Sequence, residues 1–352
     1  MSTLEHTVLT LEKRVPLTIS RGTQTHSQVV WLRWREDSIE GWGEAVPFSV
    51  GARGETGDDI VAALTSVRAE LNRTSAWHRI AVEEQLRRKR ISSALIAGIN
   101  QAMFDWAGRK TGQPVSRLLG LSPADGPFTS VTVGISAPEA ARRRVRLWRE
   151  AGDVRAFKIK LGSPDGIAAD QAMFAAVRDE VGDGGRLSID ANGGWSVPDA
   201  CKMSAWLATR GVDYLEQPLP HGCEADLIAV RAASPLPIFV DESCCVSRDL
   251  ASLTGLVDGI NIKLMKCGGL DEALRLIAAA RALGLRILVG CYGSSALGNT
   301  AAATLAPLVD YIDLDSHLNL KADPFRGATL VAGRLSLPTT PGFGITHAPE
   351  HS

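Results

Sequence analysis

The sequence predicts an α/β protein in which a closed barrel of eight parallel strands follows a smaller α+β domain. Two observations support this prediction. After residue 123, eight strand-like apolar runs recur about every 25 residues, which is the length of one strand plus one helix. Before that point, strands are followed by helices without alternation, as in an α+β domain. The GxGxxG fingerprint of an open, doubly wound sheet is absent, which favours the barrel.

The first 123 residues form the predicted α+β domain. Strand-type residues fill Val29–Trp34 and Ile39–Ala45, and the second run reads Gly-Trp-Gly-Glu-Ala from residue 41. Residues 58–112 follow the pattern of two or three helices. The C-terminal segment 320–352 is rich in turn-forming residues, and we expect it to join this domain by running back against it.

The barrel domain is predicted over residues 124–319. Helical patterns separate most of its apolar runs, so the strands must run parallel. The predicted helices include residues 138–151, 199–210 and 270–283. The apolar runs lie near residues 130–135, 156–161, 186–190, 213–216, 237–241, 259–264, 286–290 and 310–315.

Composition narrows the class of protein. With 352 residues, 45 % hydrophobic and 22 % charged, the chain is typical of a soluble globular enzyme. A net charge of −1 argues against a nucleic-acid or anionic-membrane partner, and no run of about 20 apolar residues could span a membrane. No signal peptide is evident, and six cysteines without CxxC spacing indicate reduced thiols. We therefore expect a cytoplasmic protein.

Three carboxylates mark a candidate metal site. Asp190 ends the third apolar run of the barrel, Glu216 ends the fourth and Asp241 ends the fifth. The carboxyl ends of barrel strands meet at one face, where active sites form, so these acids converge and would repel one another without a cation. Oxygen ligands with no His or Cys among them favour Mg²⁺ over Zn²⁺. The alternative is that each acid is only a helix cap or a surface residue at a strand–helix junction.

Lysines flank the predicted metal. Lys158 and Lys160 share one face of the second run because strand side chains alternate, and Lys263 ends the sixth run. Opposed across the barrel mouth, lysines could remove a proton from one face of a carbon and return one to the other. We expect Lys158 and the metal to lower the pKa of Lys160, because like charge disfavours the ammonium form. Alternatively, Lys158 and Lys160 are a solvated pair on an edge strand. Lys266 lies past the strand and is expected to be solvated.

These blocks together resemble the enolase superfamily, and within it the muconate-lactonising subgroup. The resemblance covers nearly the whole chain and includes the Gly-Trp-Gly-Glu-Ala segment. It implies an α+β capping domain over a (β/α)₇β barrel, in agreement with the fold predicted above. It also implies Mg²⁺ held by Asp190, Glu216 and Asp241, and an isomerase that moves a proton next to a carboxylate.

The eighth run narrows the choice within the subgroup. Asp313 and Asp315 lie on one face, which resembles the Asp-x-Asp pair that dipeptide epimerases use to hold the α-ammonium of the substrate. Two carboxylates at the barrel mouth also favour a cationic group. Ile19–Thr23 resembles a loop of L-Ala-D/L-Glu epimerases in which an arginine, here Arg21, meets the glutamate side chain. The alternatives are two acids in a surface loop and a solvated arginine.

The activity implied is Mg²⁺-dependent epimerisation of a small dipeptide, L-Ala-L-Glu to L-Ala-D-Glu, in murein peptide metabolism. Lys160 and Lys263 would exchange the α-proton of the second residue by two-base 1,1-proton transfer, and Lys158 would stabilise the enediolate. Residues 290–295 depart from some relatives, which leaves the preferred second residue open. The alternatives are N-acylamino-acid racemase, o-succinylbenzoate synthase or cycloisomerase chemistry, and a non-catalytic barrel. The sequence leaves open whether the chain forms a homo-oligomer.

Overall fold

The computed structural model describes residues 2–50, 53–122 and 125–348. Its N-terminal part begins with an antiparallel sheet in the order β1-β2-β3. The strands of this sheet are β1 (Thr3–Ile19), β2 (Gly22–Glu36) and β3 (Ile39–Ala45). A small hairpin and four helices follow: β4 (Ser49–Val50), β5 (Arg53–Gly54), α1 (Gly57–Leu71), α2 (Arg79–Arg88), α3 (Ser93–Thr111) and α4 (Val115–Leu118). The α+β pattern predicted for this part is confirmed.

Two glycines bring β3 against α3. A Cβ atom on Gly41 would lie 2.1 Å from the carbonyl oxygen of Ala102, and one on Gly43 would lie 2.0 Å from that of Gly98. Only residues without side chains allow the strand to approach the helix backbone this closely. The contact explains both glycines of the Gly-Trp-Gly-Glu-Ala segment. Residues 94–108 of α3 are all buried, because the helix packs against the sheet and also against α10 and α11 of the barrel.

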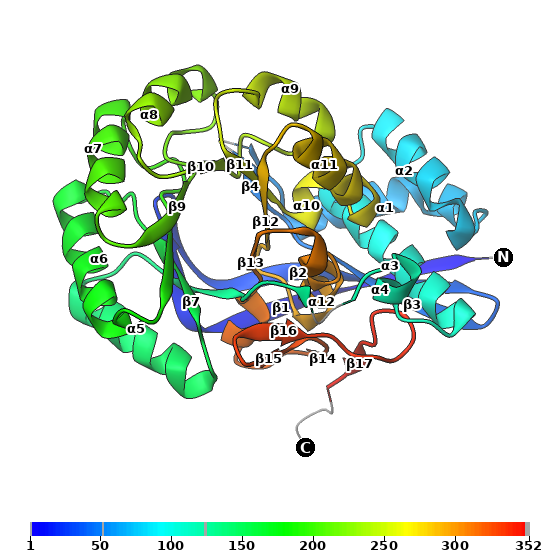
Figure 1. The fold of residues 1–352 in the computed structure, drawn as a ribbon. Helices are drawn as coiled ribbons and strands as arrows, with labels where there is room; N and C mark the ends of the chain where they lie inside the picture. The colour runs from blue at the N-terminus through cyan, green and yellow to red at the C-terminus, as the bar shows by residue number, and fades with distance from the viewer. Residues whose placement is uncertain (1, 51–52, 123–124, 349–352) are drawn as a thin grey trace.

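The second part is the predicted barrel of eight parallel strands (Figure 1). Each strand pairs with the next along the chain, and a parallel bridge between Thr129 and Ile312 joins the last strand to the first. The strands are β6 (Ser130–Val133), β7 (Ala156–Lys160), β8 (Arg186–Asp190), β9 (Val212–Glu216), β10 (Ile238–Val240), β11 (Gly259–Ile262), β12 (Arg286–Gly290) and β13 (Tyr311–Asp313). The eight predicted runs therefore correspond to the eight strands.

Helices cover the outside of the barrel strands, as α5 to α9 do in Figure 1. They are α5 (Pro138–Ala151), α6 (Ile167–Val181), α7 (Val197–Ala208), α8 (Leu227–Ala233), α9 (Leu250–Leu253), α10 (Leu264–Cys267), α11 (Leu270–Ala282) and α12 (Ala296–Ala303). No helix among the described residues combines the length and the apolar character needed to cross a membrane.

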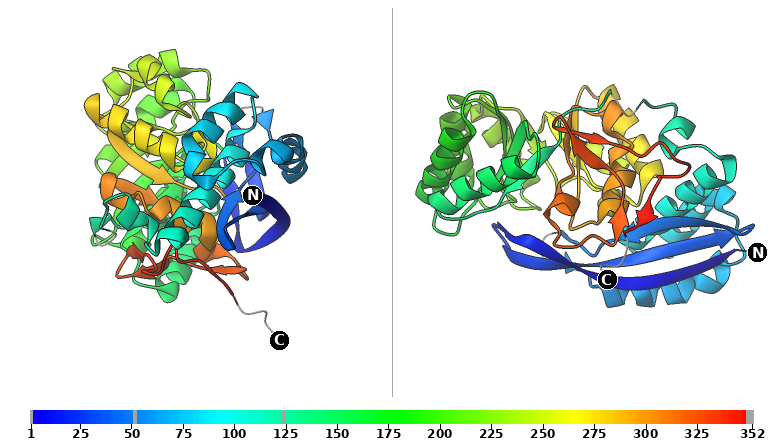
Figure 2. Two further views of the ribbon diagram at one scale, coloured as in Figure 1. Left: turned by 90° about the vertical axis from the view of Figure 1, so that its right-hand side faces the viewer. Right: turned by 90° about the horizontal axis from the view of Figure 1, so that it is seen from below.

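The C-terminal segment returns to the N-terminal part (Figure 2). It contains two short antiparallel pairs: β14 (Phe325–Arg326) with β17 (Thr346–His347), and the hairpin of β15 (Thr329–Val331) with β16 (Arg334–Ser336). Asp105 of α3 links the C-terminal segment to β3, because its carboxylate accepts hydrogen bonds from the backbone N–H groups of Phe343 and of Trp42. Phe325 also packs edge-on against Trp31 of β2, with 5.2 Å between ring centroids.

The turn between β1 and β2 lies over the mouth of the barrel. The backbone carbonyl of Thr18 accepts a hydrogen bond from the N–H of Ile135, two residues after β6, at 2.9 Å. Ser20 and Arg21, in the turn itself, donate to the carbonyl oxygen of Asn192 after β8, at 2.9 and 3.0 Å. The N-terminal part thus closes the cavity formed at the carboxyl ends of the barrel strands.

Candidate active site

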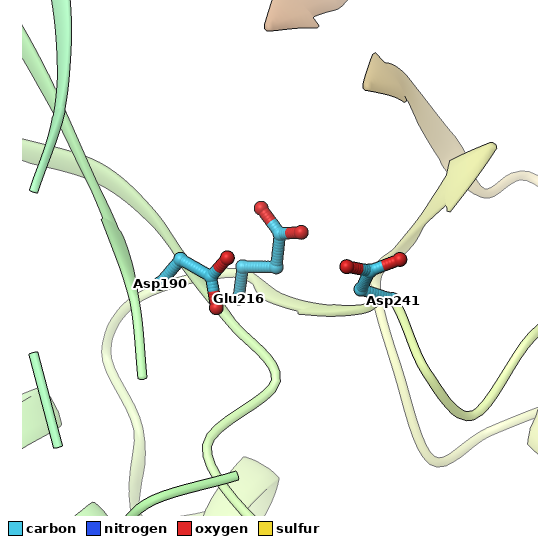
Figure 3. Close-up of side chains that lie close together, drawn as sticks. All are labelled: Asp190, Glu216 and Asp241. Atoms are coloured by element: carbon cyan, nitrogen blue, oxygen red, sulfur yellow. The ribbon is translucent and has the colours of Figure 1, made fainter. Parts of the chain in front are cut away.

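Three buried carboxylates meet at the carboxyl ends of neighbouring strands (Figure 3). Asp190 is the last residue of β8, Glu216 is the last of β9, and Asp241 directly follows β10. One oxygen of each lies within 4.8 Å of the others, and each residue is at most 1 % exposed. The structure brings the three predicted ligands together. Their all-oxygen donor set suits a hard divalent cation, which would offset their mutual repulsion.

Lys160 and Lys263 approach this carboxylate cluster from opposite sides. Lys160 ends β7, and its ammonium lies 2.6 Å from Oδ2 of Asp190. Lys263 follows β11, and its ammonium lies 2.7 Å from Oδ2 of Asp241. In the closed strand order, three strands separate β7 from β11 in either direction, so the two lysines face each other across the barrel. This is the opposition that the sequence predicts for a pair of bases.

Lys158 lies deeper in the same face of β7. Its side chain is 1 % exposed, and its ammonium lies 2.7 Å from both Oε2 of Glu216 and Oδ2 of Asp313. The alternative of a solvated edge pair is therefore wrong for Lys158 and Lys160, because both side chains point into a closed barrel.

Burial and neighbouring charges shift the pKa of both lysines and of Glu216. Burial alone would lower the pKa of Lys160, but the carboxylates around it, led by Asp190, raise that pKa above its ordinary value. The pKa of Lys263 is raised in the same way, with Asp241 as the main cause. Burial raises the pKa of Glu216 to about 7, although Lys158 opposes the shift. The raised pKa of Lys160 applies to the site without a metal ion. The lowering predicted from the sequence requires the bound metal, and it stays a prediction.

Asp313 and Asp315 form one wall of the cavity at the barrel mouth, so they are not surface acids. They are 8 % and 7 % exposed, and they line a cavity of about 1070 Å³ together with Lys160 and Lys263. Asp313 accepts a hydrogen bond from the hydroxyl of Ser130 at 3.0 Å in addition to its contact with Lys158. Burial and the charge of Asp313 raise the pKa of Asp315 to about 6.

Arg21 also lines the cavity, but its guanidinium already has protein partners. Its Nη2 lies 2.7 Å from Oε1 of Glu242, whose side chain is 4 % exposed, and its Nη1 donates to the carbonyl of Asn192. The alternative of a merely solvated arginine is therefore wrong. A substrate carboxylate would have to share or displace Glu242, and the predicted role of Arg21 in binding glutamate stays a prediction.

Nearly the whole chain matches known protein families. Residues 4–120 match the N-terminal domain of mandelate racemase / muconate lactonizing enzyme, and residues 139–351 match the enolase C-terminal domain-like family. The chain belongs to this family.

Similar proteins have been described in bacteria. A hydrophobic dipeptide epimerase of Roseobacter litoralis is 44 % identical over 97 % of this chain and 98 % of its own. Another hydrophobic dipeptide epimerase, from a Flavobacteria bacterium, is 43 % identical over 96 % of this chain and 95 % of its own. The crystal structure of a Cytophaga hutchinsonii dipeptide epimerase, complexed with Mg and D-Ala-L-Val, has a TM-score of 0.92 and 28 % identity, covering 100 % of this chain and 97 % of that one.

One expectation about this family member is wrong. Lys266 is not solvated but 2 % exposed. Its ammonium lies 2.6 Å from Oδ1 of Asp241 and donates to the carbonyl oxygens of Asn261 at 2.9 Å, Cys244 at 3.0 Å and Asp241 itself. The cause is α10, a helix of four residues that begins just after β11. Its turn directs the side chain of Lys266 back toward the end of that strand. The i, i+3 spacing of two lysines just before a Gly-Gly turn is the signal that could have revealed this.

Sequence analysis also missed two amides that orient the acids. Asn261 of β11 donates from Nδ2 to Oε1 of Glu216 at 2.6 Å. Gln217 accepts a hydrogen bond from the backbone N–H of Asp241 at 2.9 Å, and its backbone φ of 38° lies in the left-handed region. Neither residue gave a separate signal in the sequence, because an amide within or just after a strand is common.

Proposed function

We propose that the protein is a Mg²⁺-dependent dipeptide epimerase that inverts the α-carbon of the second residue by two-base 1,1-proton transfer. The observation that carries the proposal is one cluster of buried carboxylates with Lys160 and Lys263 on opposite sides of it. Relatives 43 % and 44 % identical over nearly the whole chain are named dipeptide epimerases, which supports the same activity here.

Mg²⁺ fits the carboxylate cluster, because the donors are oxygens only, fully buried and close enough to share one ion. We propose that Asp190, Glu216 and Asp241 hold it. When bound, the ion supplies positive charge beside the carboxylate of the substrate. It would also neutralise the charges that now raise the pKa of Lys160 and Lys263, which favours the neutral amine that a base requires.

The lysines of this chain divide the proton transfer between them. One of Lys160 and Lys263 removes the α-proton, and the other delivers a proton to the opposite face, which inverts the centre. Lys158 stays protonated because Asp313 and Glu216 raise its pKa well above the ordinary value. Its fixed positive charge favours the enediolate, in which negative charge develops. Asp313 and Asp315 are placed to accept the α-ammonium of the first residue.

The free ammonium distinguishes a dipeptide from the substrates of other subgroup reactions. N-acylamino acids, o-succinylbenzoate precursors and lactones carry no free α-ammonium for Asp313 and Asp315 to hold. L-Ala-L-Glu is the substrate that the sequence resemblance predicts, but its side-chain carboxylate would compete with Glu242 for Arg21. The rings of Phe48 and Tyr292 stack with 5.1 Å between their centroids, and Lys263 lies against Tyr292. These aromatic rings favour a dipeptide whose second residue has an apolar side chain, as the alternative to glutamate. L-Ala-L-Leu is therefore the comparison to make.

The test follows deuterium uptake in D₂O by mass spectrometry with L-Ala-L-Glu, L-Ala-L-Leu and their L,D epimers. Lys160→Ala and Lys263→Ala should each abolish epimerisation, while one variant can still exchange the α-proton of one epimer. Lys202→Ala, which removes an exposed lysine on α7, serves as the matched control and should behave as the wild type. Epimerisation at the wild-type rate in both active-site variants would refute the two-base mechanism.

We also propose the division predicted from the sequence, with residues 1–123 and 320–352 in a capping domain and 124–319 in the barrel. The hydrogen bond that the backbone N–H of Phe343 donates to Asp105 supports joining the C-terminal segment to the cap, whereas the boundary at 123/124 lies outside the described residues. A cytoplasmic location is proposed because the six cysteines are free thiols. A place in murein peptide metabolism would follow only from a preference for L-Ala-L-Glu.

A further inference from the structure

Two cations in the active-site cavity have no role in the proton transfer. Lys13 of β1 is 7 % exposed, and its ammonium donates to the hydroxyl of Ser27 at 2.6 Å. Arg144 of α5 is half-buried, donates to Oδ1 of Asn319 at 2.9 Å, and lies 4.0 Å from the ring centroid of Trp148. Among the residues that the structure describes, neither side chain lies within 4.0 Å of a carboxylate oxygen.

Burying positive charge beside neutral partners only is costly. The cost is visible in both groups, because burial lowers the pKa of Lys13 and lowers that of Arg144 to about 10. Both side chains line the cavity that also contains Lys160 and Lys263. A pair of cations without a carboxylate in direct ion-pair contact, inside a ligand cavity, indicates an anionic group on the ligand.

The position of the pair tells which part of the substrate it would meet. Both cations contact the segment just after Asp315, one of the two acids proposed to hold the α-ammonium: Arg144 donates to Asn319, and Lys13 forms a backbone bridge with Leu320. The charge of Asp315 also acts on both cations. Lys13 and Arg144 therefore lie at the end of the cavity that receives the first residue of the dipeptide. Gly293, in the segment after β12, makes room for Lys13 and its partner Ser27, because a Cβ atom there would lie 1.8 Å from the hydroxyl of Ser27 and 3.3 Å from the ammonium of Lys13.

We infer that Lys13 and Arg144 form a subsite for a carboxylate on the side chain of the first residue, so that the preferred dipeptides begin with Asp or Glu. The inference rests on the proposed epimerase function and adds to it. Charge balance supports it: an acidic first residue brings one ammonium to Asp313 and Asp315 and one carboxylate to the two cations. Such a preference would set this chain apart from the hydrophobic dipeptide epimerases that it resembles.

The experiment compares two nearly isosteric substrates, L-Glu-L-Leu and L-Gln-L-Leu, by kcat/KM for epimerisation, with L-Ala-L-Leu measured alongside. The wild type should favour L-Glu-L-Leu by about tenfold or more, as expected for hydrogen bonds between charged groups, and mainly through KM. Lys13→Met and Arg144→Met should each reduce this ratio severalfold. Arg146→Met removes an arginine of the same helix that pairs with Glu180 outside the cavity, and it should keep the ratio.

Using a ratio excludes misfolding as the cause, since the amount of folded enzyme cancels between two substrates. A ratio near one in the wild type, or an unchanged ratio in both variants, would overturn the subsite. If L-Ala-L-Leu is epimerised while the ratio is near one, only the subsite fails. If none of the dipeptides exchanges its α-proton, the proposed function fails and the subsite falls with it.

Discussion

Lys266 offers the sharpest test of how the site is held together. Replacement by Met keeps the length of the side chain but removes an ammonium that donates to Asp241, Cys244 and Asn261. Removing one partner of a buried ion pair costs about 3–5 kcal/mol, because the remaining groups lose their compensation. The entropy of unfolding is about 2.1 cal/mol/K per residue, hence about 0.7 kcal/mol/K for 352 residues. The melting temperature should therefore fall by about 4–7 °C.

The assay is thermal unfolding followed by calorimetry and circular dichroism at neutral pH. Lys202→Met is the control, because this exposed lysine should change the free energy of unfolding by less than about 0.5 kcal/mol. Lys266→Arg should restore only part of the loss, since a planar guanidinium does not reproduce the directions of an ammonium's hydrogen bonds. A melting temperature of Lys266→Met within about 1 °C of the wild type would refute the structural role assigned to this lysine.

Two further predictions concern β3, where Glu44 contacts Ser295 of the barrel and Gly43 packs against α3 within the N-terminal part. Burial raises the pKa of Glu44 to about 8, against the hydrogen bonds from Ser295. The folded state then holds this proton more tightly than the unfolded state, so stability falls as pH rises from about 5 to 8, by up to about 4 kcal/mol. Glu44→Gln should remove that fall, and parallel curves of melting temperature against pH would contradict it. Gly43→Ala should destabilise by about 1–3 kcal/mol through its clash with α3. Gly54→Ala is the control, because a Cβ atom on Gly54 would meet open space. Equal denaturant midpoints for the Gly43→Ala and Gly54→Ala variants would exclude the close packing of β3 on α3.

Several features of this protein could be predicted from sequence because they follow from local periodicity. Apolar runs at the spacing of one strand plus one helix specify a parallel barrel, and a closed parallel barrel places all strand ends of one direction at one face. Asp190, Glu216 and Asp241 therefore had to meet, and Lys160 had to lie opposite Lys263. No knowledge of side-chain packing was needed for these positions.

Other features depended on contacts between distant parts of the chain. Arg21 pairs with Glu242, more than 200 residues away, and only the docking of the β1–β2 turn over the barrel mouth brings them together. Lys13 reaches the cavity because Gly293 leaves space for it. Lys266 is buried because a single helical turn reverses its direction. In each case the sequence shows that the residue is charged, and only the tertiary structure determines its partners. The reason is that ion pairing and desolvation depend on distances between groups far apart in the chain, which local sequence patterns do not specify.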